Sequence, residues 1–102
     1  MSTATDVKID EKIIVSIQPP KLWKVIFLND DKTPMEFVIE LLTSIFKHPV
    51  ETAKELTLEI HNTGSAVVGV YSHEIAEQKG IDATSIARVN GHPLQITLEQ
   101  DQ

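Results

Sequence analysis

Residues 22–38 read LWKVIFLNDDKTPMEFV, an apolar run followed by a polar turn and then by a second apolar pattern. The run from Leu22 to Leu28 is rich in Trp, Val, Ile and Phe, which is typical of a β-strand whose faces are partly covered. Turn-forming residues 29–33 follow, and Thr33 is placed as a helix N-cap with Pro34 at the first helical position. The sequence therefore predicts a strand, a short loop and a helix in direct succession.

Two amphipathic helices are expected after this loop. Apolar residues at helical spacing predict the first from Pro34 to about Phe46. The second runs from Pro49 to about Thr63, and Gly64 is placed to end it in the left-handed conformation. Its expected buried face holds Val50, Ala53, Leu56 or Thr57, and Ile60.

The C-terminal part alternates strand and helix signals. Residues 65–71 are β-branched and apolar, and Gly69 within them indicates that a neighbour approaches closely. Ser72 can cap a third helix, for which poor helix formers predict a break near Gly80. The apolar stripe expected on this helix is Ile75, Ala76, Ala83, Ile86 and Ala87, and a last strand is predicted from the alternation of Leu94, Ile96 and Leu98 with polar residues.

This order of elements, βααβαβ, predicts an α+β fold. Each amphipathic helix needs another layer to bury its apolar stripe, so we expect a small three-stranded antiparallel sheet with three helices packed on it. Residues 1–20 are polar apart from an apolar patch at Ile13–Ile17 and end at two prolines, which predicts a flexible N-terminal extension. The folded domain is expected to cover residues 21–102.

Composition excludes several classes of function. The chain has 102 residues, no cysteine and a formal net charge of −6, with a sequence pI near 5.0. Disulfides and thiolate chemistry are excluded, and the negative charge argues against a nucleic-acid partner. The N-terminus lacks the pattern of a secretory signal and no apolar run is long enough to span a membrane. We expect the cytoplasm, or the interior of an organelle such as a plastid, and no membrane partner.

The histidines give no positive case for an enzyme or a metal site. The run His73 to Glu77 lacks the second histidine that a metalloprotease helix requires. His48 and His92 each precede a proline and are expected in loops. His61 lies at the expected end of the second helix, where a helix-capping role and a ligand role both remain open. We expect no enzyme and no cofactor, with a hydrolase that uses His61 and Asp31 as the least favoured alternative.

Three polar residues, Asn29, Asp30 and Asp31, directly follow the first strand. They fit a turn that caps the next helix, which the pattern alone favours, and they also fit a site for a cation. An ammonium group offers three donors and no acceptor, so carboxylate and amide oxygens and a neutral imidazole nitrogen suit it. The helix that begins near Met35 would supply an apolar wall beside them.

The stretch from Trp23 to Val38, with its N-D-D-x-T-P-M-E-F-V core, resembles the signature of the ClpS family of adaptor proteins. The likeness covers about residues 22–99, and it continues at residues 60–61, 64, 66–67, 69–71, 74, 76–77, 79, 87–88 and 92–94. Membership of this family implies a non-enzymatic adaptor that binds N-degrons, which are proteins with an exposed Phe, Tyr, Trp or Leu as first residue. It also implies that the adaptor delivers them to a Clp unfoldase-protease.

The resemblance also implies roles for individual residues. The implied amine site is Asn29, Asp30, Asp31 and His61. Within it, Asn29, Asp31 and His61 would receive the α-amino group, whereas Asp30, together with Thr33, would shape the entrance. The implied hydrophobic pocket is Thr33, Met35 as the gate, Val38, Thr57, Ile60 and Leu94. Thr57 stands where many family members have methionine, and Lys32 replaces a commonly aromatic residue.

The resemblance implies that Glu74 and Lys79 contact the N-terminal domain of a ClpA- or ClpC-type unfoldase. It also implies that the N-terminal extension engages this unfoldase during delivery. We expect a monomer. The alternative is an interaction domain that resembles the C-terminal domain of the ribosomal stalk protein and has another partner. That domain lacks the N-D-D-x-T-P-M signature.

Overall fold

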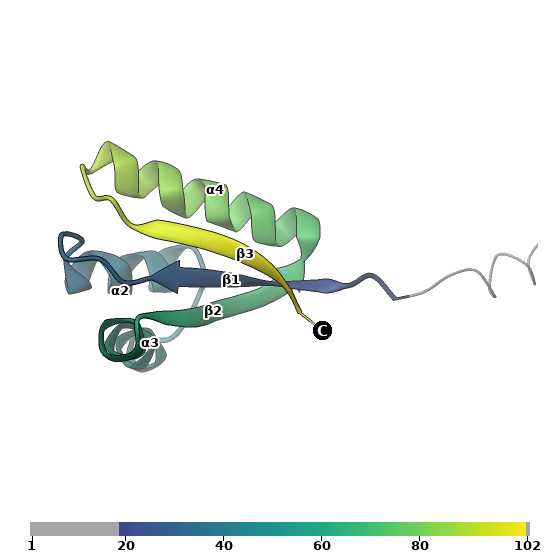
Figure 1. Ribbon diagram of the computed structural model, residues 1–102, viewed down its shortest axis with the longest axis horizontal. Coiled ribbons are helices and arrows are strands. Elements are labelled where there is room, and N and C mark those ends of the chain that lie inside the picture. Colours follow the sequence, from purple (N-terminus) through teal and green to yellow (C-terminus); the bar gives the residue numbers. More distant parts are fainter. Residues whose placement is uncertain (1–18, 102) are drawn as a thin grey trace, which may run out of the picture.

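The computed structural model describes residues 19–101, so the predicted extension lies outside it apart from Pro19 and Pro20. The apolar patch at residues 13–17 is likewise outside the described part. Figure 1 shows three strands and three helices in the predicted order. No helix in the described range is long and apolar enough to cross a membrane. The elements are β1 (Leu22–Leu28), α2 (Met35–Ser44), α3 (Val50–Thr63), β2 (Ser65–Ser72), α4 (His73–Val89) and β3 (Gln95–Asp101).

The sheet has the strand order β2-β1-β3 and is antiparallel throughout. Phe27 lies at its centre, opposite Ala66 of β2 and Ile96 of β3. The register with β2 shifts between Val25 and Ile26, so that Val68 is the extra residue of a bulge. The predicted α+β class and the three-stranded antiparallel sheet are confirmed.

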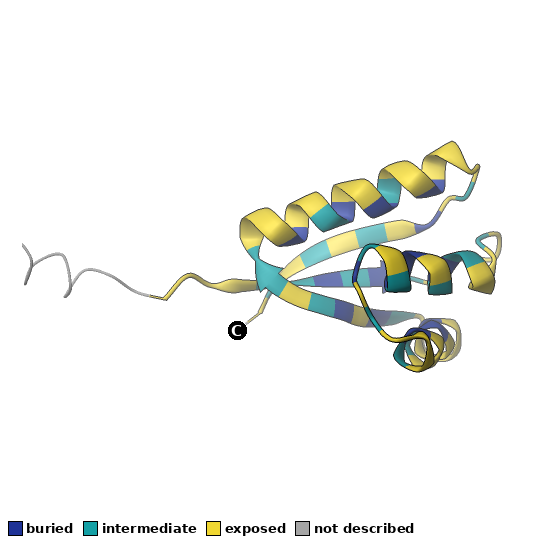
Figure 2. Ribbon diagram, turned by 180° about the vertical axis from the view of Figure 1, so that it is seen from behind, coloured by how far each residue is buried: buried dark blue, intermediate teal, exposed yellow. Residues whose placement is uncertain are grey.

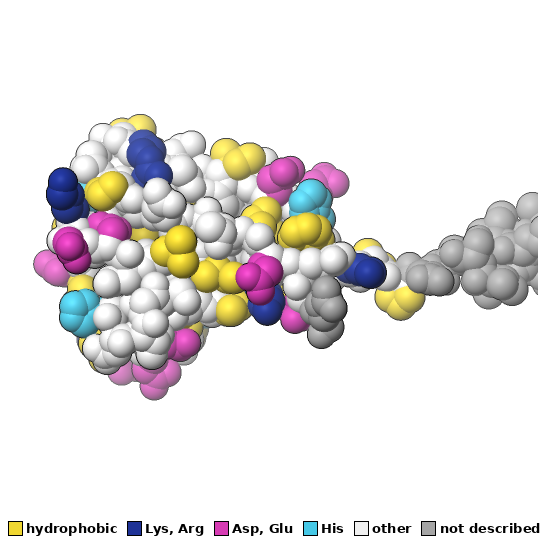
Figure 3. Space-filling view, viewed as in Figure 1, with side chains coloured by type: hydrophobic (Ala, Val, Ile, Leu, Met, Phe, Trp, Pro, Cys, Tyr) yellow, Lys and Arg dark blue, Asp and Glu magenta, His cyan; other side chains and the backbone are white. Residues whose placement is uncertain are grey.

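Alternate residues of β1 separate the two faces of the sheet. Val25 and Phe27 are fully buried on one face, and the helices lie on this side, as the view from behind shows (Figure 2). Phe27 packs edge-on against Phe46 with ring centroids 5.5 Å apart. The other face carries the ion pair of Lys24 and Glu99, with a 3.4 Å N–O distance, and a small apolar area (Figure 3).

The ends of α2 and α3 agree with the expected positions to within two residues, but their caps differ in part. Pro34, and not Thr33, is the N-cap of α2, because the Thr33 hydroxyl donates to Asp30 instead. Gly64 ends α3 with a φ of 98°, as predicted. Val50 was wrongly placed in the buried face of α3, since it is 53% exposed while Ala53, Thr57 and Ile60 are buried.

Helix α4 is continuous, so the predicted break near Gly80 is wrong. Its buried face consists of small residues, and the larger Ile75 and Ile86 of the expected stripe are exposed. A Cβ at Gly80 would lie 3.8 Å from Leu98 and 3.9 Å from Ile96, so the glycine marks close contact between α4 and β3. Ser72 occupies the N-cap position without a side-chain capping bond. The buried residues of α4 are Ala76, Gly80, Ala83 and Ala87.

The close approach predicted at Gly69 is confirmed, because a Cβ there would overlap the ring of Tyr71. That ring lies 6.4 Å from the ring of Phe46, measured between centroids. Gly69 therefore makes room for an aromatic contact between β2 and the segment after α2.

Candidate functional site

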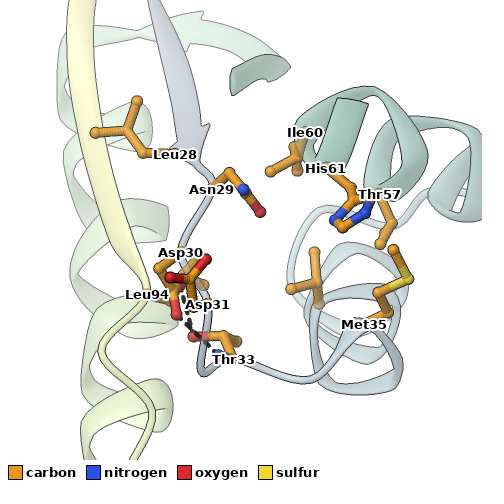
Figure 4. Close-up of a pocket in the computed structure, with 11 residues that line it drawn as sticks. Leu28, Asn29, Asp30, Asp31, Thr33, Met35, Thr57, Ile60, His61 and Leu94 are labelled. Carbon is orange, nitrogen blue, oxygen red and sulfur yellow. Dashed lines mark hydrogen bonds between the residues drawn. The ribbon is translucent and has the colours of Figure 1, made fainter. Parts of the chain in front are cut away.

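A cavity of about 370 Å³ opens where β1 ends, α2 begins and α3 ends (Figure 4). It is lined by every residue that the sequence analysis assigned to the amine site and the hydrophobic pocket. Leu28, which the sequence analysis did not name, also lines it. The lining residues are Leu28, Asn29, Asp30, Asp31, Thr33, Met35, Val38, Thr57, Ile60, His61 and Leu94.

The loop between β1 and α2 is held by the carboxylate of Asp30. This carboxylate accepts hydrogen bonds at 2.8 Å from the Lys32 N–H, the Thr33 N–H and the Thr33 hydroxyl. Partial burial by itself would raise the pKa of Asp30. The Thr33 hydroxyl, the two backbone N–H groups and the nearby His92 outweigh that effect and hold the pKa below its ordinary value of 3.8.

The polar side of the cavity combines two segments that are far apart in the chain. Asn29 and Asp31 come from the loop after β1, and His61 comes from the last turn of α3. The Asn29 N–H donates to the Gly64 carbonyl at 2.9 Å, which ties the end of β1 to the C-cap of α3. Because Gly64 directly follows the turn that carries His61, this bond brings the imidazole and the Asn29 amide to the same cavity (Figure 4).

The apolar side of the cavity comes mainly from the helices. Val38 and Ile60 are buried, Leu94 is almost completely buried just before β3, and Met35 at the start of α2 is 36% exposed. Thr57 is also buried, and its hydroxyl donates to the Ala53 carbonyl at 2.7 Å. With its hydrogen bond made inside α3, Thr57 contributes a short side chain and no free donor to the wall.

Leu94 is held in place by contacts made from α4 and α2. One guanidinium nitrogen of Arg88 donates to the carbonyls of His92 and Leu94, at 2.9 Å and 2.8 Å. The His92 ring packs edge-on against Phe37 of α2, with centroids 4.5 Å apart. As expected, His92 and His48 lie outside the helices and strands. This role of Arg88 is not visible in the sequence, since a lone arginine near a helix end gives no specific signal.

The cavity thus has two chemically different sides. Carboxylate, amide and imidazole groups lie at the polar side, and hydrocarbon and thioether groups lie at the other. Such a site suits a ligand with an ammonium group next to a bulky apolar group. Within residues 19–101, no group of three or more His, Asp and Glu side chains could hold a metal ion.

Glu74 and Lys79 lie away from this cavity, on α4, where they line a second hollow with Ile75, Gln78 and Asp82. Lys79 has a structural role that the sequence did not reveal. Its Nζ donates to the carbonyl of Ile45, the C-cap of α2, at 2.8 Å. The same ammonium lies over the rings of Tyr71 and Phe46, 5.3 Å and 5.9 Å from their centroids. Lys79 therefore fastens the end of α2, which has no basic residue in its own last turn.

Comparison with known proteins identifies the family. Residues 18–97 match the model of the family described as ATP-dependent Clp protease adaptor protein ClpS. The chain belongs to the ClpS family. Curated ClpS adapter proteins from Sodalis glossinidius and Serratia proteamaculans are each 46% identical to it over 91 residues, which is 89% of this chain and 86% of theirs. The family name describes an adaptor of a protease, so the resemblance seen in the sequence is confirmed and the ribosomal stalk alternative is not favoured.

A solved ClpS structure agrees with the fold. The structure of ClpS2 from Agrobacterium tumefaciens bound to L-phenylalaninamide has a TM-score of 0.79 and 42% sequence identity to this chain. The match covers 81% of this chain and 100% of that one. The ligand in that structure carries a free amine next to an aromatic side chain, which is the combination of groups that the present cavity suits.

The hydrogen bonds of the Asp30 carboxylate should stabilise the folded protein. We expect Asp30→Asn to lower the free energy of unfolding at pH 7 by about 1 kcal/mol, because charge-assisted hydrogen bonds within the loop are weakened. Since the folded-state pKa is below 3.8, this stabilisation is complete above that value and is lost as the pH falls through the folded-state pKa. Urea unfolding of both proteins at pH 7, 5 and 3 measures the difference in the free energy of unfolding. A difference that stays constant down to pH 3 contradicts the prediction.

Proposed function

We propose that this ClpS-family protein recognises N-degrons by their free α-amino group together with a bulky hydrophobic first side chain, and delivers them to a Clp unfoldase-protease. The observation that carries the proposal is the close association of amine acceptors with an apolar cavity. The proposed ligands are polypeptides that begin with Phe, Tyr, Trp or Leu. The protein acts without a cofactor and without catalytic chemistry of its own.

The polar side selects a free N-terminus. We assign reception of the ammonium group to Asn29, Asp31 and His61, which supply an amide oxygen, a carboxylate and an imidazole nitrogen. A free N-terminus has three N–H donors and a positive charge, whereas an internal peptide group has one donor and no charge. An internal segment would leave acceptors at this site without partners, and that loss disfavours its binding.

Asp30 has a different task within the same site. Its carboxylate oxygens already accept three hydrogen bonds from the loop, so we assign it to holding Asn29, Asp31 and Thr33 in position. This assignment agrees with the role in shaping the entrance that the family resemblance implied. The lowered pKa supports it, because the hydrogen bonds from Thr33 and Lys32 that hold the loop are the ones that favour the charged carboxylate.

The apolar side selects the first side chain. A cavity of about 370 Å³ is large enough for an aromatic or leucine side chain. Met35 lies at its rim as the gate, while Val38, Ile60 and Leu94 form the interior. Because Thr57 is short and has its hydroxyl bonded within α3, it leaves space next to the gate that a longer residue would fill.

Delivery uses a separate surface. We propose that the hollow on α4 with Glu74 and Lys79 contacts the N-terminal domain of a ClpA- or ClpC-type unfoldase, and that a monomeric adaptor presents residues 1–20 to the machine. Glu74 is exposed and available for a partner. Lys79 is engaged with Ile45 and two aromatic rings, so its contribution to docking includes fixing the end of α2. Because the protease is ATP-dependent and the relatives are bacterial, we place this process in the cytoplasm.

Binding should depend on the free amine. We expect acetylation of a Phe-first peptide to weaken its affinity at least about a hundredfold, because charge-assisted hydrogen bonds contribute roughly 2 kcal/mol each when desolvated. Fluorescence anisotropy with the free and the acetylated peptide measures this. Asp31→Asn should weaken the binding of the free peptide only. Glu40→Gln, which changes an exposed carboxylate on the outer side of α2, is the matched control. Equal affinity for both peptides would end the amine-site assignment.

The short side chain of Thr57 should relax discrimination at the first position. We expect the wild-type protein to tolerate Ile-first and Val-first peptides better than Thr57→Met does, by about 1 kcal/mol, with smaller effects on Phe and Leu. Isothermal titration of the four peptides measures this difference. Thr57→Val is the matched control, since it removes the hydroxyl and keeps the shape. An unchanged ratio of Ile to Leu affinity in Thr57→Met would show that this residue does not control the choice of first side chain.

The surface on α4 is tested by charge reversal. We expect Glu74→Lys to weaken binding to the isolated N-terminal domain of a ClpA- or ClpC-type unfoldase about tenfold. The new lysine would either face a partner group of the same charge or lack a partner group of opposite charge. Glu77→Lys is the matched control, with the same charge change on the same helix outside the hollow. Calorimetric titration of both variants measures the effect, and a parallel peptide titration monitors the cavity. Equal losses in both variants would argue for a general charge effect instead.

A further inference from the structure

Met35 is an exposed thioether within a binding cavity. It is the first residue of α2, lines the cavity and is 36% exposed. It is also the sole methionine among residues 19–101. In Figure 4 its sulfur end points toward Thr57 at the rim of the cavity. The Met35 side chain is therefore open to a solvent-borne oxidant, whereas Val38, Ile60 and Leu94 of the apolar wall are buried.

Peroxides oxidise accessible methionine to the sulfoxide. The sulfur lone pair attacks one peroxide oxygen, the O–O bond breaks, and an S–O bond forms. Sulfur is oxidised by two electrons, and the peroxide is reduced to water, or to an alcohol in the case of an alkyl hydroperoxide. The product replaces a flexible apolar side chain by a polar one with a strong hydrogen-bond acceptor.

The cavity offers this new oxygen no suitable donor on its apolar side. Val38, Ile60 and Leu94 are hydrocarbon, and the hydroxyl of Thr57 already donates to Ala53. The Thr33 hydroxyl donates to Asp30. Asn29 and His61 can donate, but in the proposed function both must present acceptors to the ligand's ammonium group. The first side chain of a bound ligand would therefore remove water from the sulfoxide, or the sulfoxide would compete with the ligand's ammonium group for Asn29 and His61. Both effects oppose binding.

We propose that Met35 is an oxidation site through which peroxides reversibly switch off N-degron recognition. This inference rests on the proposed function of the cavity. Reversal requires a methionine sulfoxide reductase with a dithiol reductant, in which two thiols become a disulfide and the oxygen leaves as water. The adaptor would then release N-degron substrates under oxidative conditions and recover without new synthesis.

The experiment uses the full chain and a fluorescent Phe-first peptide. Protein is treated with hydrogen peroxide, the peroxide is removed, and oxidation at each methionine is quantified by peptide mass spectrometry. We expect the treated protein to bind about tenfold more weakly once Met35 is converted, and methionine sulfoxide reductases of both stereospecificities with dithiothreitol to restore the affinity. Each protein is compared with its own untreated sample.

Two variants assign the effect to this sulfur. Met35→Leu, which retains Met1 and every other oxidisable residue, should show the same affinity before and after peroxide. Met35→Gln, which introduces a polar acceptor of similar length, should bind weakly without peroxide and respond little to it. Unchanged affinity of the wild-type protein with Met35 oxidised would overturn the inference, as would an equal loss in Met35→Leu. If the untreated protein fails to bind the free-amine peptide, the proposed function itself is wrong.

Discussion

The geometry of the site depends on one carboxylate, that of Asp30. Its three hydrogen bonds bend the chain sharply between the central strand and α2. The bend sets the direction in which Asn29 and Asp31 leave the sheet, and it places Met35 at the first turn of the helix. A loop with freely rotating polar side chains would have to become ordered on binding and would lose affinity through that entropy. In the proposed function, the ligand meets a loop whose backbone is already held in place.

The fold brings the two sides of the cavity together through backbone contacts. The strand β1 is buried between β2 and β3, so its end has little freedom, and the Asn29 N–H is bonded to the carbonyl of Gly64. On the opposite side, Arg88 holds the segment that carries Leu94. Asn29 on the polar side and Leu94 on the apolar side are thus each held by a hydrogen bond of their own backbone. This support explains how a small domain can hold a rigid two-sided pocket.

The sequence predicted the order of elements and the left-handed end of α3, because β-branched runs and Gly64 are strong local signals. The residues that the N-D-D-x-T-P-M resemblance implied line one cavity, and their roles in binding stay a prediction. The predictions from sequence failed where two local arrangements compete. Thr33 could cap α2 or bond to Asp30, and only the folded loop decides between them. Alanine and glycine gave no clear periodicity in α4, so Ile75 and Ile86 were assigned to the buried face and Gly80 to a break. The bond from Lys79 to Ile45 spans α4 and α2 and depends on tertiary packing, which local patterns do not encode.

The hydrogen bond between Asn29 and Gly64 uses only main-chain atoms, whereas the apolar wall is built from side chains of α2 and α3. Main-chain contacts persist when side chains are exchanged, so the wall can diversify under selection while the strand end and the helix cap beside Asn29 and His61 keep their positions. The domain is in this respect a natural template for a panel of reagents that each read a different terminal amino acid. Such a panel could be obtained by varying a few wall positions on one scaffold.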